Sequence, residues 1–245
     1  MAGLRRAKDL GCAWVEFDVR LTADGAVVLC HDARLERTTT GHGRVAAQTL
    51  AAIRECDAGS WFHPDFAGEL VPTLDEALAL ARELDLAVNI EVKADPGRAP
   101  ATAVAVLTGL RRLGGRSPTV LVSSFLAPAL AALRDIAPEI PRGLLLRVIP
   151  RGWRVLATRL GCATINTDHR RLKPRLVGEI RAAGYPLLAY TVNDPRRARA
   201  LFDWGVTSVF SDVPDIILPV SAEDPVRRLA AGLHASDQLQ QGAIR

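Results

Sequence analysis

Long apolar runs are absent from this 245-residue sequence, and none approaches the roughly 20 residues that a membrane-spanning helix requires. The first residues, MAGLRRAKDLGCAW, also lack the apolar stretch of a signal peptide. Cysteine is scarce: four residues lie far apart and form no C-x-x-C pair, which argues against a zinc site and against a disulfide framework. We therefore expect a cytoplasmic protein with reduced cysteines and no stable membrane insertion.

Aromatic residues are also few, at 5% of the sequence, and they do not alternate with the arginines. The formal net charge is +4, but the basic residues are scattered and form no long run. A nucleic-acid-binding arm would combine such a run with aromatic side chains, so we expect no nucleic-acid partner. The arginines are better interpreted as solvated helix faces, although a mildly basic surface would also attract an anionic substrate.

Strands and helices alternate along most of the sequence, in which 49% hydrophobic and 24% charged residues suit a globular enzyme. The expected strands are short and nearly continuously apolar, which predicts a parallel sheet covered by helices on both faces. A parallel barrel of roughly 250 residues forms one domain. The expected helices span residues 73–83, 101–113, 128–136, 153–160, 174–183, 195–204 and 212–218, and the expected strands span residues 86–93, 119–123, 143–147, 163–166, 186–192 and 207–210.

The front of the sequence departs from a complete barrel. Residues 2–10 predict the last turns of a helix, with no strand before them. A strand at 13–19, a short return strand at 26–30 and an irregular stretch with one short helix at 49–55 follow. This pattern gives seven barrel strands, whereas a closed barrel of this type has eight. We expect an α/β fold of the TIM (β/α)8 type that lacks its first strand, with the barrel domain at residues 1–220, a small insertion after the second barrel strand at about 32–72, and a polar tail at 221–245.

Acidic side chains stand near the carboxyl ends of two expected strands, where barrels bind their ligands. Glu16 and Asp18 are two residues apart on one strand, so both project to the same face. Glu91 has a similar position on the next barrel strand and shares its face with Lys93. Three convergent carboxylates favour a bound cation, and hard oxygen ligands suit Mg²⁺ or Ca²⁺ better than zinc. Solvated acids at a strand end, with a Glu91–Lys93 ion pair, are the alternative interpretation.

His31 directly follows the short return strand, just downstream of the acidic pair. A lone histidine at such a place is often a core residue, but a histidine beside a metal–phosphate site is expected to transfer protons near neutral pH. Lys93 is a natural partner for a phosphate oxygen. Asn193 belongs to a set of polar residues at other strand ends that are candidates for substrate contacts, although capping of the following helices explains most of them equally well.

Several motifs together resemble the glycerophosphodiester phosphodiesterase family. They are VEFDVRLTADGAVVLCHD (15–32), LERTTTGHGRV (35–45), DAGSWF (57–62), VPTLDE (71–76), NIEVK (89–93), VSSF (122–125), TVND (191–194) and GVTSVFSDVP (205–214). These matches are collinear and extend over residues 3–218, so their combination is specific although each motif alone is weak.

The resemblance implies a TIM barrel that hydrolyses glycerophosphodiesters to sn-glycerol 3-phosphate and an alcohol. It implies that Glu16, Asp18 and Glu91 hold a divalent cation, that His31 is one of two catalytic histidines, and that Lys93 binds phosphate. The implied mechanism is in-line attack on phosphorus by the substrate's own glycerol hydroxyl, through a cyclic phosphate. The cation would neutralise the developing charge and lower the pKa of the hydroxyl.

One family feature is missing at the front: the strand that ends in His-Arg-Gly, followed by a loop with Pro-Glu-Asn-Thr. A start of translation roughly 25–30 residues further upstream, about one strand–helix unit of a barrel, is the explanation that we expect. A truncated paralogue that binds a metal or a phosphate ligand without turnover is the alternative. A related barrel enzyme that acts on intact phospholipid is a third reading, and the lack of a membrane-insertion helix argues mildly against it.

Overall fold

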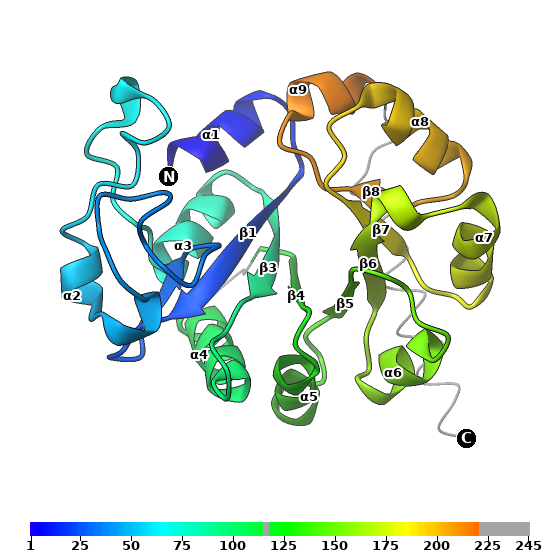
Figure 1. The fold of residues 1–245 in the computed structure, drawn as a ribbon, viewed down its shortest axis with the longest axis horizontal. Coiled ribbons are helices and arrows are strands. Elements are labelled where there is room, and N and C mark those ends of the chain that lie inside the picture. The colour runs from blue at the N-terminus through cyan, green and yellow to red at the C-terminus, as the bar shows by residue number, and fades with distance from the viewer. Residues whose placement is uncertain (115–117, 221–245) are drawn as a thin grey trace.

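The computed structural model describes residues 1–114 and 118–220, and it shows a curled sheet with helices around its outer face (Figure 1). The expected tail at 221–245 lies outside the described residues. The strands are β1 (Trp14–Leu21), β2 (Val27–Leu29), β3 (Ala87–Val92), β4 (Val120–Ser124), β5 (Arg142–Leu146), β6 (Thr164–Asp168), β7 (Leu187–Tyr190) and β8 (Ser208–Val209). The helices are α1 (Ala2–Asp9), α2 (Leu50–Ile53), α3 (Leu74–Glu83), α4 (Ala99–Arg112), α5 (Ala127–Ile136), α6 (Trp153–Arg159), α7 (Pro174–Ala182), α8 (Pro195–Asp203) and α9 (Pro214–Ile217).

The sheet has the order β2-β1-β3-β4-β5-β6-β7-β8. β2 pairs antiparallel with the end of β1, and the seven other strands are parallel, which confirms the seven expected barrel strands. In the described part of the chain, β8 pairs only with β7, and β1 pairs only with β2 and β3. The sheet therefore curls as a barrel does but remains open between β1 and β8.

Local sequence signals explain where the helices begin and end. Thr73 accepts a hydrogen bond from the Glu76 backbone N–H, and the Glu76 carboxylate accepts one from the Thr73 backbone N–H, so the expected capping box at the start of α3 is present. Asp194 caps α8 by accepting from the Arg196 backbone N–H. The last expected helix is shorter than the sequence suggests: α9 starts at Pro214 and covers four residues before a 3-10 turn.

Two apolar clusters lie between the sheet and the helices. One packs β1, β3 and β4 against α3, α4 and α5, and the other packs β5, β6 and β7 against α6, α7 and α8. A smaller cluster inside the curl contains Leu121, Ala163 and Leu188, with Trp14 and Phe210 packed beside them. No described helix is long and apolar enough to cross a membrane.

The insertion at residues 32–72 has a small core of its own, built around Leu35, Val45, Ile53 and Val71. Asp57 orders its far loop, because its carboxylate accepts hydrogen bonds from the backbone N–H groups of residues 59, 60 and 68. Polar contacts also join the insertion to the barrel, and the Arg98 guanidinium donates to the carbonyl oxygens of residues 22 and 46. The insertion is therefore anchored beside the carboxyl end of β1 (Figure 1).

Candidate active site

The acidic residues of β1 lie on the inner face of the curl. Strand alternation buries Phe17 and Val19 beneath the helices, so that the two residues are 8% and 0% exposed, and turns Glu16 and Asp18 inward. In the parallel register with β3, Asp18 lies opposite Glu91 and Glu16 lies opposite Asn89. This register brings the three predicted acidic residues together: one carboxylate oxygen from each of Glu16, Asp18 and Glu91 lies within 4.8 Å of the others.

The protonation of these carboxyl groups reflects their crowding. Surrounding protein atoms, followed by the charges of Asp18 and Glu91, raise the pKa of Glu16 to about 8, although its side chain borders an open cavity. Burial also raises the pKa of Glu91, which is 8% exposed, while its hydrogen bond to Lys93 acts in the opposite direction. At neutral pH the cluster therefore tends to retain a proton unless a positive charge enters it.

Lys93 supplies one positive charge at the edge of the cluster. Its Nζ forms an ion pair with Glu91 and lies 3.2 Å from Asp18 Oδ1. Burial alone would lower the pKa of Lys93, but the contacts with the two carboxylates outweigh it and raise the pKa above its ordinary value. The ammonium group also lies 5.6 Å from the centre of the Phe125 ring, which Tyr190 supports edge-on at 5.9 Å. Lys93 is thus held at the mouth of the curl.

These residues fit a divalent cation. Three oxygen-donor carboxylates converge from two neighbouring strands, and burial, with the neighbouring carboxylates, raises the pKa values of two of them. Mg²⁺ and Ca²⁺ prefer such ligands. The single ammonium of Lys93 pairs with Glu91 and Asp18, and no described residue forms an ion pair with Glu16.

His31 lies beside this cluster, close enough that its charge lowers the pKa of Glu91. Its side chain is 60% exposed, and its Nδ1 lies 2.7 Å from Asp32 Oδ1. Arg37 also binds Asp32, at 2.5 and 3.0 Å, so the carboxylate is held in place. The guanidinium of Arg20 donates to the His31 carbonyl oxygen at 2.9 and 3.1 Å. If Nδ1 donates to Asp32, Nε2 is the ring nitrogen that remains available as an acceptor.

Asn193 follows β7, and its side chain binds the loop after β8. Its Nδ2 donates to Asp212 Oδ2 at 2.9 Å, and its Oδ1 accepts from the Ser211 hydroxyl at 3.1 Å and from the Asp212 backbone N–H at 2.9 Å. In this arrangement both ends of the amide are engaged. Asp212, one of the polar residues expected at strand ends, is near enough to contribute to the raised pKa of Glu16.

Comparisons with known proteins identify the family to which the chain is similar. The glycerophosphoryl diester phosphodiesterase family model matches residues 1–216. A glycerophosphodiester phosphodiesterase from Caldanaerobacter subterraneus subsp. tengcongensis is 31% identical over 219 residues, which cover 89% of each chain. One from Bacillus subtilis is 32% identical over 228 residues, covering 86% of this chain and 77% of the relative.

A solved structure is also similar over nearly the full length. It is a phosphodiesterase from Oleispira antarctica in complex with the product sn-glycerol-3-phosphate, with a TM-score of 0.88, 35% identity, and coverage of 91% of this chain and 90% of that chain. The family match and these relatives cover most of the described barrel. On this evidence, the chain belongs to the glycerophosphoryl diester phosphodiesterase family.

Proposed function

We propose that this protein hydrolyses glycerophosphodiesters to sn-glycerol 3-phosphate and an alcohol, with a divalent cation held by Glu16, Asp18 and Glu91. The observation that carries the proposal is the convergence of these three carboxylates within 4.8 Å in a chain of this family. The product seen in the Oleispira antarctica phosphodiesterase supports the choice of substrate class. Water-soluble diesters from deacylated phospholipids have the required chemistry.

The cation is proposed to have two effects on the substrate. Mg²⁺ or Ca²⁺, when bound, neutralises negative charge on the phosphodiester and lowers the pKa of the attacking hydroxyl. The raised pKa values of Glu16 and Glu91 favour their protonated forms. Both groups must lose this proton when the cation binds, because only the carboxylate is a ligand. Asp18, which lies opposite Glu91 in the register, completes the proposed set of ligands.

Lys93 and His31 are proposed to act on the phosphate and on the proton. Lys93 Nζ lies beside two of the three carboxylates. Its positive charge is proposed to bind a nonbridging phosphate oxygen of the substrate. His31 is positioned through Asp32 and Arg20, and its free Nε2 removes or delivers the proton during in-line attack. Asn193 is proposed to contact the phosphate or the glycerol, which requires its amide to exchange its present contacts with the loop after β8.

The alternative is a protein that binds the cation and a phosphate ligand without turnover. The open side of the sheet next to Glu16 favours it, because an incompletely enclosed site admits water and weakens electrostatic stabilisation.

One experiment separates the two functions. Release of sn-glycerol 3-phosphate from glycerophosphocholine is measured with Mg²⁺ or Ca²⁺, with a chelator, and with Glu91→Gln. Hydrolysis that both the chelator and the substitution abolish supports the enzyme. Binding of sn-glycerol 3-phosphate with no release of product from the diester supports the alternative.

A further inference from the structure

The basic residues of this protein are distributed unevenly along the chain. Residues 140–178 contain nine lysines and arginines and one acidic residue, Asp168. The formal charge of the whole chain is only +4, so the rest of the chain has more acidic than basic residues. The stretch runs from just before β5 through α6 and β6 into α7, on the side of the curl away from α1 and α2 (Figure 1). One sector of the barrel therefore carries the excess of positive charge.

Five of these basic side chains form the surface that we call the basic rim. They are exposed, and no described residue forms an ion pair with any of them: Arg147, Arg151, Arg154, Arg171 and Lys173. By contrast, Arg170 pairs with Asp168 and Arg175 pairs with Glu179. Ion pairs of this kind keep the local charge near zero, whereas the basic rim concentrates uncompensated positive charge on one surface.

The basic rim lies at the end of the barrel where the candidate active site opens. Arg147 directly follows β5, just as Lys93 directly follows β3, and the two strands are parallel in one sheet. Tyr190 joins the two regions, because its hydroxyl donates to the Leu146 carbonyl oxygen at 3.0 Å and its ring supports the Phe125 ring beside Lys93. The charge of Arg147 also acts on Tyr190. The rim therefore borders the mouth of the curl.

Exposed aliphatic side chains accompany the rim. Val148 is 53% exposed in the loop after β5, and Val155 is 73% exposed in the first turn of α6. Arg151 and Arg154 lie between them in the chain. Trp153, the aromatic residue of this segment, is buried, and the Arg154 guanidinium lies 5.6 Å from its ring centre. Residues 147–155 thus present positive charge and aliphatic groups, but no exposed ring on which a nucleic-acid base would stack.

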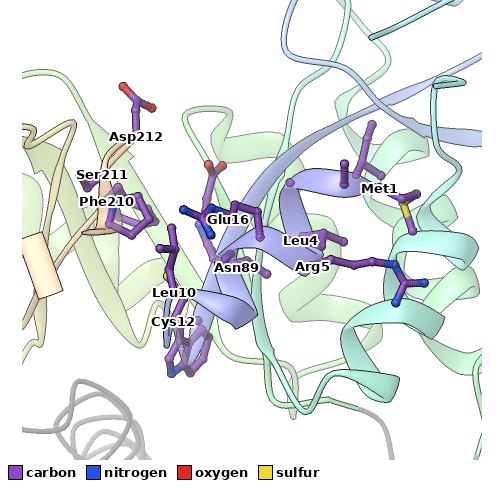
Figure 2. Close-up of a pocket in the computed structure, with 18 of the residues that line it drawn as sticks. Met1, Leu4, Arg5, Leu10, Cys12, Glu16, Asn89, Phe210, Ser211 and Asp212 are labelled. Carbon is purple, nitrogen blue, oxygen red and sulfur yellow. The ribbon is translucent and has the colours of Figure 1, made fainter. Parts of the chain in front are cut away.

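The acidic residues of the candidate active site lie on the other side of the mouth. Figure 2 shows Glu16 beside the cavity that Asp212 also lines. Glu16 belongs to β1 and Asp212 follows β8, the two strands that flank this cavity, whereas the rim follows β5 and β6 in the middle of the sheet. These carboxylates therefore leave the charge of the rim free to attract a large anionic surface.

We propose that the basic rim docks on the surface of an anionic lipid bilayer, with Val148 and Val155 in the headgroup region and the mouth of the curl facing the lipid. Clusters of roughly four to eight basic residues bind acidic lipid headgroups, and each charge contributes about fivefold to the binding constant. Aliphatic groups that enter the interface add to this attraction. Docking of this kind needs no membrane-spanning helix, and the described helices include none.

The experiment measures sedimentation of the 245-residue chain with two kinds of vesicle. One consists of phosphatidylcholine, and the other is an equal mixture of phosphatidylcholine and phosphatidylglycerol. The rim variant is Arg147→Gln/Arg151→Gln/Arg154→Gln. Its matched control removes the same charge from three exposed arginines on α1, α4 and α8 that form no described ion pair: Arg6→Gln/Arg111→Gln/Arg199→Gln.

The unsubstituted chain should bind the mixed vesicles but not those of phosphatidylcholine alone. This binding should be strong at ~0.1 M salt and weak at ~1 M salt, because salt screens the attraction. The rim variant should bind the mixed vesicles about 100-fold more weakly. The control variant should lose less than about threefold, since its substituted charges lie far from the docked surface.

A second pair of variants tests the two valines. Val148→Ser/Val155→Ser should bind the mixed vesicles about tenfold more weakly, because less apolar surface leaves water. Its control is Val104→Ser/Ile136→Ser, which changes side chains of 41% and 46% exposure on α4 and α5 and should bind like the unsubstituted chain. Every substituted residue is exposed, so the variants should fold, and the thermal unfolding midpoint of each one checks this.

Four results would overturn the proposal. Failure of the unsubstituted chain to bind the mixed vesicles would show that the rim does not dock on anionic lipid. Equal losses in the rim variant and its control would show attraction by net charge alone. Unchanged binding by the valine variant would show that the valines do not enter the headgroup region. Tighter binding to a DNA duplex than to the vesicles, lost in the rim variant, would assign the rim to nucleic acid. None of these readouts depends on hydrolysis, so they are independent of the proposed function.

Discussion

A divalent cation should stabilise this protein against heat, and the substitution Glu91→Gln should remove that stabilisation. Three carboxylates lie within 4.8 Å of one another, and two have raised pKa values. Two unit charges at this separation repel by about 3 kcal/mol at an effective dielectric constant of ~20, before solvent and Lys93 reduce the value. A cation replaces this repulsion with attraction.

The expected size of the effect follows from ligand linkage. A cation at about 100 times its dissociation constant stabilises the folded state by about 2.7 kcal/mol. For a domain of this size, 1 kcal/mol shifts the unfolding midpoint by roughly 2–4 °C, so we expect a shift of about 5–11 °C. The assay is thermal unfolding followed by circular dichroism near pH 8, with a chelator and with millimolar Mg²⁺ or Ca²⁺.

Glu91→Gln retains the shape of the side chain but removes one negative charge. With chelator present, we expect its midpoint to equal or exceed that of the unsubstituted chain, because one repulsive charge is gone. With cation present, the shift should nearly disappear. Glu83→Gln is the matched control, since Glu83 is exposed and, among the described residues, forms an ion pair with Arg5 alone. A full shift in Glu91→Gln, or an equal loss in Glu83→Gln, would refute the reasoning.

Four further predictions concern the site and the fold. His31→Ala should lower kcat about 10²–10⁴-fold with little change in KM. Steady-state hydrolysis of glycerophosphocholine measures both constants. A change mainly in KM would argue against proton transfer by His31. Lys93→Met should mainly raise KM for the diester, because a charge on the phosphate is lost, and an unchanged KM would exclude that contact. The raised pKa of Glu16 predicts that, with chelator present, the stability of the unsubstituted chain relative to Glu16→Gln falls as pH rises from about 4.5 to about 8. Unfolding of both forms in urea across this range checks the sign, and a flat or rising difference contradicts it. Thr73→Ala should cost about 1 kcal/mol by removing the cap of α3, whereas Thr73→Ser should retain most of that stability in the same urea titration.

Much of the fold could be predicted because its signals are local. The Thr73 capping box fixes the start of α3, and strand alternation alone places Glu16 and Asp18 on one face with Phe17 on the other. The convergence of Glu91 with these two acids needed only the rule that neighbouring parallel strands end at the same edge.

Other features depend on contacts between distant residues, and no local pattern carries them. Arg142 was expected outside its strand, but it opens β5, is 3% exposed and donates to carbonyl oxygens of five residues in two loops. The engagement of Asn193 with Asp212 joins two strand ends 19 residues apart. The raised pKa of Glu16 likewise depends first on burial by the folded chain and then on the charges of Asp18, Glu91 and Asp212.

The most direct test of the central claim is a crystal structure grown with Mn²⁺ and sn-glycerol 3-phosphate. The account predicts one anomalous peak at bonding distance from carboxylate oxygens of Glu16, Asp18 and Glu91, with the phosphate between that peak and Lys93. A well-ordered site with no peak among these carboxylates, or a phosphate bound elsewhere, would contradict it.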